Sequence, residues 1–347
     1  MENAILVGFQ SLVELRELAE AAGGHVVKEV VQHRTKPDAS FFIGKGKAHE
    51  LRDDVLVHDA DLVIFDEGLS PAQMRNLEAL LEVKVVDRTG LILDIFARRA
   101  KTREGKLQVE LAQLNYHLSH LAGRSDWLSR LGGGIGTRGP GETQLEVDRR
   151  RVRERIARLT RAIDQVRKHR QLHRSRRRRS NQQVVSLVGY TNAGKSTLFR
   201  RLSGEDTLVS GRVFSTLDTL VRRVRLGGKT TLLVSDTVGF IRKLPHELVT
   251  AFRATLEEVV ESDLILHVVD ASDPDYPEKM GAVADVLRDI GCGDQALLTV
   301  YNKSDLVEFP SVPSEGAVLV SALKGEGIDR LKELLLEELR TVHEVPF

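Results

Sequence analysis

One stretch of the sequence constrains the fold more than any other. The mostly apolar run VVSLV at 184–188 leads directly into GYTNAGKS at 189–196, and TLFRRL follows with helical spacing. The middle segment has the form G-x-x-x-x-G-K-S between a strand and a helix, the context that makes this pattern specific for a P-loop. Backbone N–H groups in such a loop converge on phosphate, aided by the positive end of the helix. The sequence therefore predicts an α/β domain with a phosphate-binding loop.

This loop supplies two side chains with separate expected roles. Lys195 should reach the β- and γ-phosphate oxygens and act in catalysis, and the Ser196 hydroxyl should ligate Mg²⁺. The residues expected to contact the nucleotide here are Gly189, Tyr190, Thr191, Asn192, Ala193, Gly194, Lys195, Ser196 and Thr197.

Two further segments are expected beside the phosphates. DTVG at 236–239 follows TLLVS and fits D-x-x-G, so Asp236 should hold Mg²⁺, and the Gly239 amide should face the γ-phosphate and act in catalysis. FSTLD at 214–218 lies in a polar connection where a first switch belongs. Thr216 is the threonine expected to ligate Mg²⁺ and act in catalysis, with Thr219 as the weaker alternative. The two segments contain Phe214, Ser215, Thr216, Leu217, Asp218, Asp236, Thr237, Val238 and Gly239.

Two later segments indicate which base is bound. Asn302-Lys303-Ser304-Asp305 follows a strand-like run and fits N-K-x-D. The Asp305 carboxylate can accept hydrogen bonds from the N1–H and the exocyclic amine of guanine, a donor pair that adenine does not offer. The stem of Lys303 can cover the ring. Ser321-Ala322-Leu323 follows another apolar run, and a backbone amide there would meet the base oxygen. The sequence therefore predicts a Ras-like GTPase domain over residues 181–347, with a mostly parallel sheet and helices on both faces.

One position departs from the common pattern. Phe240 directly follows D-x-x-G, where many GTPases carry a glutamine that positions the attacking water. A phenyl ring cannot orient water by hydrogen bonding. We therefore expect slow hydrolysis by the protein alone, with the missing group supplied by another loop or by a partner. A role for Phe240 in packing is compatible with this expectation.

The first hundred residues predict a different, smaller domain. Strand-like runs at 4–9, 25–31, 61–67 and 83–88 alternate with helix-like segments at 11–22, 46–57 and 70–81. Such alternation is typical of a parallel α/β domain, placed here at residues 1–100. The glycine turn at 44–47 precedes a helix and could bind an anion, although such turns are usually only turns.

A helical hairpin is predicted between the two domains, over residues 101–180. The leucines at 107, 111, 114, 118 and 121 and the apolar residues at 152, 156, 159, 163 and 166 share one spacing, 4-3-4-3. Two matching stripes joined by GGGIGTRGPGETQLE at 132–146 predict antiparallel helices with a glycine-rich tip. No Lys-Ser pair follows these glycines, so the tip lacks the groups that hold a triphosphate. A plain connection between helices is the alternative.

The second arm of this hairpin carries most of the chain's charge asymmetry. From Arg149 to Arg179 there are fourteen Arg and one Lys against Glu154 and Asp164, a balance of +13 in a chain whose net charge is +1. Such a segment predicts a polyanionic partner met at one place, with a merely solvated helix face as the alternative.

The composition of the chain indicates the cellular compartment in which the protein is expected. The single cysteine, Cys292, excludes an intramolecular disulfide and favours a reducing compartment. The N-terminus has no basic segment or apolar run of signal-peptide type, and no run reaches the length of a membrane span. We expect a soluble, cytoplasmic protein without stable membrane insertion, monomeric when free.

Taken together, the glycine-rich stretch, the basic helix, GYTNAGKSTLF, FSTLD, DTVGF and NKSD resemble the HflX family of translational GTPases across nearly the whole chain. The resemblance implies GTP or GDP and Mg²⁺ as cofactors, with K⁺ bound near Asn192. It also implies binding to the large ribosomal subunit and its rRNA, not to DNA. The activity implied is splitting or rescue of stalled ribosomes under stress, with the tip reaching the functional centre of the subunit.

A second interpretation remains beside this one. The chain could be a membrane- or protein-directed signalling GTPase whose arginines bind anionic lipid or an acidic partner. The aromatic-poor basic arm and the absence of lipidation motifs favour RNA.

Overall fold

The computed structural model describes residues 1–33, 36–120, 144–179, 182–204, 213–214, 216–217, 219–227, 230–242, 256–292, 295–308 and 316–344. The chain divides into two compact units, Met1–Arg98 with Lys106–Asp164, and Arg99–Gly105 with Gln165–Phe347. Among the helices that the structure describes, none is long and apolar enough to cross a membrane.

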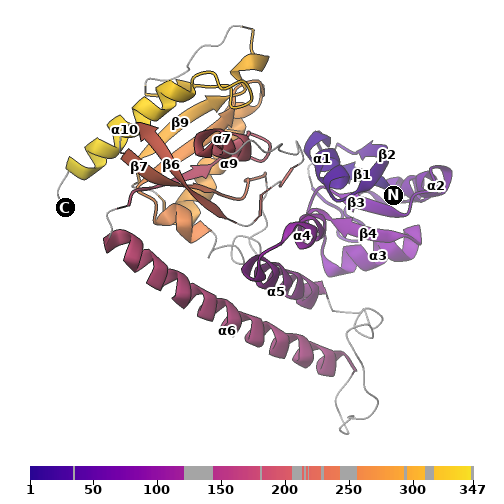
Figure 1. The fold of residues 1–347 in the computed structure, drawn as a ribbon. Helices are drawn as coiled ribbons and strands as arrows, with labels where there is room; N and C mark the ends of the chain where they lie inside the picture. The colour runs from indigo at the N-terminus through magenta and orange to yellow at the C-terminus, as the bar shows by residue number, and fades with distance from the viewer. Residues whose placement is uncertain are drawn as a thin grey trace. The chain divides into compact units, whose positions relative to one another are not determined.

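The first unit contains a four-stranded parallel sheet in the order β2-β1-β3-β4 (Figure 1). Its strands are β1 (Glu2–Gly8), β2 (Gly24–Val31), β3 (Leu62–Phe65) and β4 (Lys84–Asp87). The helices α1 (Val13–Ala21), α2 (Lys45–Val57) and α3 (Pro71–Leu81) join consecutive strands, as parallel pairing requires. The predicted parallel α/β fold is confirmed, with the predicted elements in the predicted order.

The helix α3 begins where its local sequence directs it to begin. The Ser70 hydroxyl accepts from the Gln73 backbone N–H, and the Gln73 side chain accepts from the Ser70 N–H. Pro71 occupies the first helical position, where no N–H is needed. This reciprocal capping satisfies two backbone donors that the helix itself leaves without partners.

The helix α4 (Arg88–Arg99) was not predicted from the sequence, and it follows β4 without a connecting residue. Arg88 is buried at this junction. Its guanidinium pairs with Asp66 at 2.6 Å and also with Glu14. These carboxylates compensate the buried cation, which would be strongly destabilising without a partner.

The two predicted apolar stripes lie on α5 (Arg103–His120) and α6 (Gln144–Arg179) and pack against each other, while Leu121, the last residue of the first stripe, lies outside the described residues. Arg155 on α6 also pairs with Glu110 on α5 at 2.6 Å. The Tyr116 hydroxyl donates to the buried Asp87 carboxylate at 2.8 Å, which attaches α5 to the end of β4. The glycine-rich segment at 132–143 lies outside the described residues. The stripe residues in contact are Leu107, Leu111, Leu114, Leu118, Val152, Ile156 and Leu159.

The second unit is built on a six-stranded sheet in the order β10-β9-β8-β5-β7-β6. The central strands are β5 (Val184–Val188), β7 (Thr230–Asp236), β8 (Leu264–Asp270) and β9 (Leu297–Asn302), all parallel. The short β10 (Val318–Leu319) is also parallel, whereas the edge strand β6 (Leu220–Gly227) runs antiparallel to β7. This is the mostly parallel, Ras-like sheet that the motifs predict.

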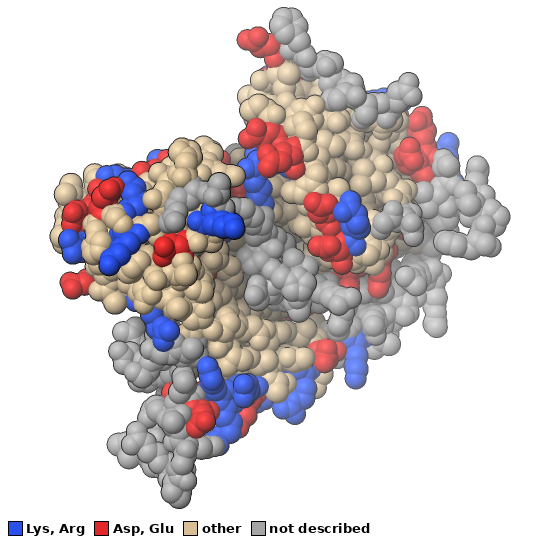
Figure 2. Space-filling view, turned by 180° about the vertical axis from the view of Figure 1, so that it is seen from behind, with Lys and Arg blue, Asp and Glu red and all other residues tan. Residues whose placement is uncertain are grey.

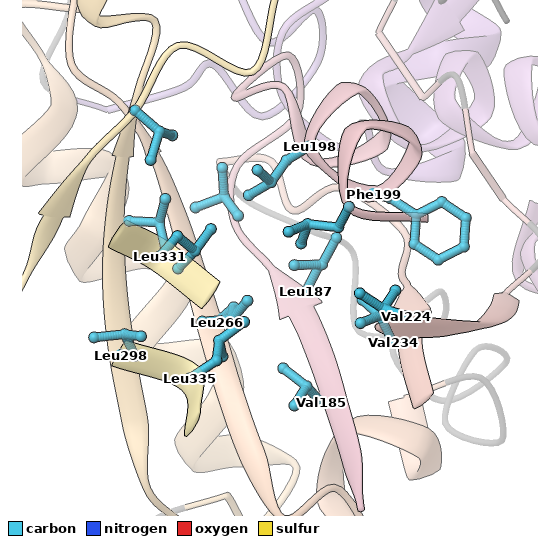
Figure 3. Close-up of a cluster of buried hydrophobic side chains, with 14 of the residues drawn as sticks. Val185, Leu187, Leu198, Phe199, Val224, Val234, Leu266, Leu298, Leu331 and Leu335 are labelled. Carbon is cyan, nitrogen blue, oxygen red and sulfur yellow. The ribbon is translucent and has the colours of Figure 1, made fainter. Parts of the chain in front are cut away.

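Helices cover both faces of this sheet. On one face, α7 (Lys195–Ser203) and α10 (Ile328–Glu344) contribute leucines to the same core as the strands, as Figure 3 shows. On the other, α9 (Tyr276–Asp289) contacts β8, and its buried Val283 and Leu287 lie outside that core. Close-packed apolar side chains of this kind fix the strand ends, which carry the functional residues.

Candidate nucleotide site

The four central strands of the second unit, β5, β7, β8 and β9, end at one edge of the sheet. β5 leads into the loop 189–194, β7 ends at Asp236, β8 at Asp270 and β9 at Asn302. The registers place these ends side by side, with Leu187 opposite Asp236 and Asp270 opposite Asn302. Ligands of open α/β sheets bind outside these carboxyl ends.

The P-loop needs glycine at both of its ends. Gly189 has φ +149° and Gly194 has φ +90°, values that side chains rarely adopt. A Cβ on Gly189 would lie 2.2 Å from the Val268 carbonyl oxygen, and a Cβ on Gly194 would lie 2.2 Å from Asn302 Nδ2. The two glycines therefore let the loop pass against β8 and β9.

Lys195 is buried at the start of α7, and its ammonium lies under the loop. Nζ donates to the carbonyl oxygens of Gly189 at 2.9 Å and Tyr190 at 2.8 Å. Burial lowers the pKa of Lys195 to about 8, while the nearby Asp236 carboxylate acts in the opposite direction. The lysine is thus held at the loop by the loop's own backbone.

The three expected metal ligands meet at one point. Ser196 Oγ lies 2.7 Å from Asp236 Oδ2 and 2.7 Å from Thr216 Oγ1, and the Thr216 hydroxyl donates to Asp236 Oδ2 at 2.9 Å. Burial is the largest influence on the Asp236 carboxyl and raises its pKa, against the two hydroxyl donors and Lys195. Thr219 Oγ1, the alternative ligand, is buried and has no partner within the described part of the chain.

This group of oxygens fits a hard divalent cation. Asp236 Oδ1 is buried and has no hydrogen-bond partner among the residues described, so one carboxylate oxygen has no protein donor to satisfy it. Mg²⁺ prefers such oxygen ligands, with one or two carboxylates and hydroxyl or water oxygens completing the set. A cation would also stabilise the charged form that burial disfavours. Within the described residues, no cluster of three or more His, Cys, Asp and Glu side chains offers another metal site.

The D-x-x-G segment lies directly on the P-loop. A Cβ on Gly239 would lie 2.9 Å from Thr191 Cα and 3.1 Å from Lys195 Nζ, so a side chain does not fit there. The Phe240 carbonyl accepts from Thr191 N–H at 2.6 Å, and Phe240 N–H donates to the Gly189 carbonyl at 3.1 Å. The Phe240 ring is buried, so this residue packs within the protein and offers no polar group to a water molecule.

The expected base-reading residues are held by a short chain of hydrogen bonds. Asn302 Nδ2 donates to the Ala193 carbonyl at 2.9 Å, and Asn302 Oδ1 accepts from Ala322 N–H at 2.9 Å. The Ser321 hydroxyl donates to Asp305 Oδ1 at 2.6 Å. That bond is the largest influence on the Asp305 carboxyl and lowers its pKa, so the carboxylate remains an acceptor at neutral pH.

Some expected contact residues also have partners within the protein. Phe214 and Leu217 are buried, the Thr237 hydroxyl donates to the Leu187 carbonyl at 2.6 Å, and Lys303 pairs with Asp270 at 2.6 Å. Ser215 and Asp218 lie outside the described residues.

One set of contacts was not predicted. The Tyr190 hydroxyl accepts from Arg242 N–H at 2.6 Å, and Lys279 Nζ lies 5.2 Å from the centre of the Tyr190 ring. A tyrosine at a variable loop position carries no sequence signal for such contacts.

The described part of α6 presents its cations to solvent. Figure 2 shows Lys and Arg side chains along the helix, with few acidic ones among them. The exposed arginines between 150 and 161 are Arg150, Arg151, Arg153, Arg155, Arg158 and Arg161.

Comparison with known families divides the chain into three consecutive matches. Residues 10–97 match the family described as GTP-binding GTPase N-terminal, and residues 99–177 match GTP-binding GTPase Middle Region. Residues 184–303 match the family described as 50S ribosome-binding GTPase.

Curated relatives match over nearly the full chain. A protein named GTPase HflX from Caldanaerobacter subterraneus is 49% identical, covering 97% of this chain and 81% of the relative. GTPase HflX from Escherichia coli (strain K12) is 45% identical, covering 97% of this chain and 83% of the relative. A crystal structure of a GTP-binding protein from Sulfolobus solfataricus with GDP shares the fold, with TM-score 0.51 and 23% identity, over 99% of this chain and all of the other.

Proposed function

The chain belongs to the HflX family of GTPases, and from that premise we propose that it is a ribosome-directed member that splits or rescues stalled ribosomes under stress. As a member of this family it binds guanine nucleotides and hydrolyses GTP. The ribosomal partner, the metal and the roles of individual residues form the proposal. It places the protein in the cytoplasm, as a monomer when free, without affinity for DNA.

The observation that carries the nucleotide part is the contact among Ser196, Thr216 and Asp236 beside Lys195. These three residues would hold Mg²⁺, which neutralises developing charge on the phosphates when bound. Lys195 would exchange its two carbonyl partners for β- and γ-phosphate oxygens. The Gly239 amide would face the γ-phosphate, since no side chain intervenes there.

Discrimination between nucleotide bases would rest on the segments Asn302–Asp305 and Ser321–Leu323. The Asp305 carboxylate would accept from the N1–H and amine of guanine, and the Ala322 amide would face the base oxygen. Lys303 would lie over the ring. Because Asn302 bridges Ala193 and Ala322, the base and phosphate halves share one support.

Hydrolysis by the free protein would be slow, because the buried Phe240 cannot orient the attacking water. The ribosome would supply or position the missing group. Potassium bound near Asn192, an exposed residue with φ 62° in the P-loop, would assist through its charge at the phosphates.

The ribosomal part is supported by the matched family's description and by the basic helix α6. Arginines that neutralise RNA phosphates release counterions, which gives strong affinity without sequence specificity. The glycine-rich segment at 132–146, with Arg138 as its cation, would reach the functional centre of the large subunit.

Co-sedimentation with separated ribosomal subunits tests this proposal. With a non-hydrolysable GTP analogue we expect the protein to pellet with the large subunit, and we expect GTP hydrolysis to rise when subunits are added. Ser196→Ala, which removes one proposed metal ligand, should lose the stimulated hydrolysis. Failure to pellet with either subunit, together with flotation on anionic vesicles, would favour the membrane-directed alternative.

A further inference from the structure

The P-loop helix contacts the base-side loop at a place outside the recognised motifs. Arg201, in the last turn of α7, donates from Nε to the Ala322 carbonyl at 3.1 Å and from Nη2 to the Leu323 carbonyl at 2.5 Å. A Cβ on Gly325 would lie 3.6 Å from Arg201 Cζ. The guanidinium therefore lies against the backbone of the loop that would meet the guanine oxygen.

Arg201 supplies the second of two links that join this loop to the P-loop and the helix α7 that follows it. The first is Asn302, which joins the Ala193 carbonyl to Ala322 N–H. Both backbone polar groups of Ala322 are thus held, the N–H by Asn302 and the carbonyl by Arg201. The planar fork of a guanidinium suits two neighbouring carbonyls, an arrangement that a single ammonium matches poorly.

The loop at residues 321–327 contains backbone that a further contact would help to order. It closes on itself through Gly325 N–H to the Ser321 carbonyl at 2.7 Å and Ser321 N–H to the Glu326 carbonyl at 3.0 Å. Gly325 and Gly327, with φ +86° and +72°, give it a backbone that is entropically costly to order. Contacts that order such a loop before binding reduce the cost of binding.

We propose that Arg201 is a positioning residue for guanine recognition, which fixes the Ser321–Leu323 segment against the P-loop helix, slows nucleotide release and sharpens base choice. The proposal rests on the proposed base site. A simpler role for Arg201 would be to offset the partial negative charge at the C-terminal end of α7. The described hydrogen bonds of Arg201, however, go to the loop and not to the carbonyls of α7.

Two measurements on the full-length protein test this role. The first is the dissociation rate of GDP, followed with a fluorescent derivative. The second is the preference for GDP over 6-thioguanosine diphosphate, in which a weakly accepting sulfur replaces the base oxygen. We expect Arg201→Ala to release GDP about 10-fold faster, since hydrogen bonds from a charged donor contribute on the order of one decade in affinity. Its preference for GDP should shrink. Arg201→Lys should fall between it and the unmodified protein.

The matched control is Arg288→Ala, which removes an exposed arginine whose ion pair among the described residues is the local one with Asp285 on α9. It should change neither measurement. If Arg201→Ala weakens both nucleotides equally, in step with lower thermal stability, or changes neither measurement, Arg201 is structural and the inference is wrong. If the unmodified protein itself does not distinguish the two nucleotides, the proposed base site fails as well.

Discussion

Replacing Asp305 with asparagine should convert the base preference of this protein. Asp305 Oδ1 already accepts the Ser321 hydroxyl, and the introduced amide can keep that bond through its own carbonyl oxygen. The exchange then replaces the other carboxylate oxygen by an NH₂ group, which would face the donors of guanine. The loss of charged acceptor contacts should cost about 2–4 kcal/mol of GTP affinity, or about 30- to 1000-fold. Xanthosine triphosphate, with a carbonyl in place of the amine, should bind more tightly.

Equilibrium titrations with fluorescent GTP, competed by unlabelled GTP and xanthosine triphosphate, measure both affinities. Asp329→Asn, which changes a carboxylate that is 98% exposed on α10, serves as the control for the loss of one negative charge. Thermal unfolding without nucleotide should be unchanged, because the Ser321 contact survives. GTP binding by Asp305→Asn at the unmodified affinity would refute the assignment of Asp305 to the base.

Four further expectations concern other parts of the chain. Hydrolysis should be faster in K⁺ than in Na⁺, and equal rates in the two salts, with and without ribosomes, would refute a potassium site near Asn192. We expect the logarithm of ribosome affinity to fall with the logarithm of salt concentration, with a slope set by roughly five neutralised phosphates. Replacing Arg176–Arg179 with Gln should make this slope shallower and leave GTP binding by the free protein intact. An unchanged slope would point to other arginines or another partner. Replacing Gly132–Gly136 with a Ser-Asn linker of equal length should leave nucleotide binding normal and abolish ribosome-stimulated hydrolysis or splitting; retention of both would make this segment a plain connector. Burial, followed by the Lys195 charge, lowers the pKa of His267 to about 4. As pH drops from 6.5 towards 4, this imidazole is protonated in the unfolded chain before it is protonated in the folded protein, so the free energy of unfolding should fall over that range. His267→Asn should flatten that fall in urea titrations, and an unaltered pH profile would contradict it.

Most strands of the two sheets were predictable because their signals are local, whereas the arginine-rich edge strand β6 was not predicted. Apolar runs such as LVIF at 62–65 and VVSLV at 184–188 form strands where they were expected. The helix α4 escaped prediction because β4 passes into it without a turn residue. Its first residue, Arg88, is a buried cation whose partners, Glu14 and Asp66, are distant in sequence. Only the folded chain brings that charge and its partners together.

The site was predictable residue by residue but not as an arrangement. The motifs name Ser196, Thr216 and Asp236 separately, and the sheet brings their oxygens into contact. The backbone pairing of Phe240 with the P-loop has no side-chain signature, because main-chain hydrogen bonds do not depend on residue type. The contact from Arg201 was missed for a related reason, since an arginine near a helix end usually interacts with that helix or with solvent.

The buried ammonium of Lys195 links phosphate binding to proton exchange with the solvent. With a pKa of about 8, a fraction of these side chains is neutral in mildly alkaline solution. A phosphate anion beside the nitrogen favours the charged form, so binding at such pH draws a proton from the buffer. The measured heat of binding then contains the ionisation heat of whichever buffer is present. Nucleotide affinity should weaken as pH rises above 8, because each complex formed there must also capture a proton.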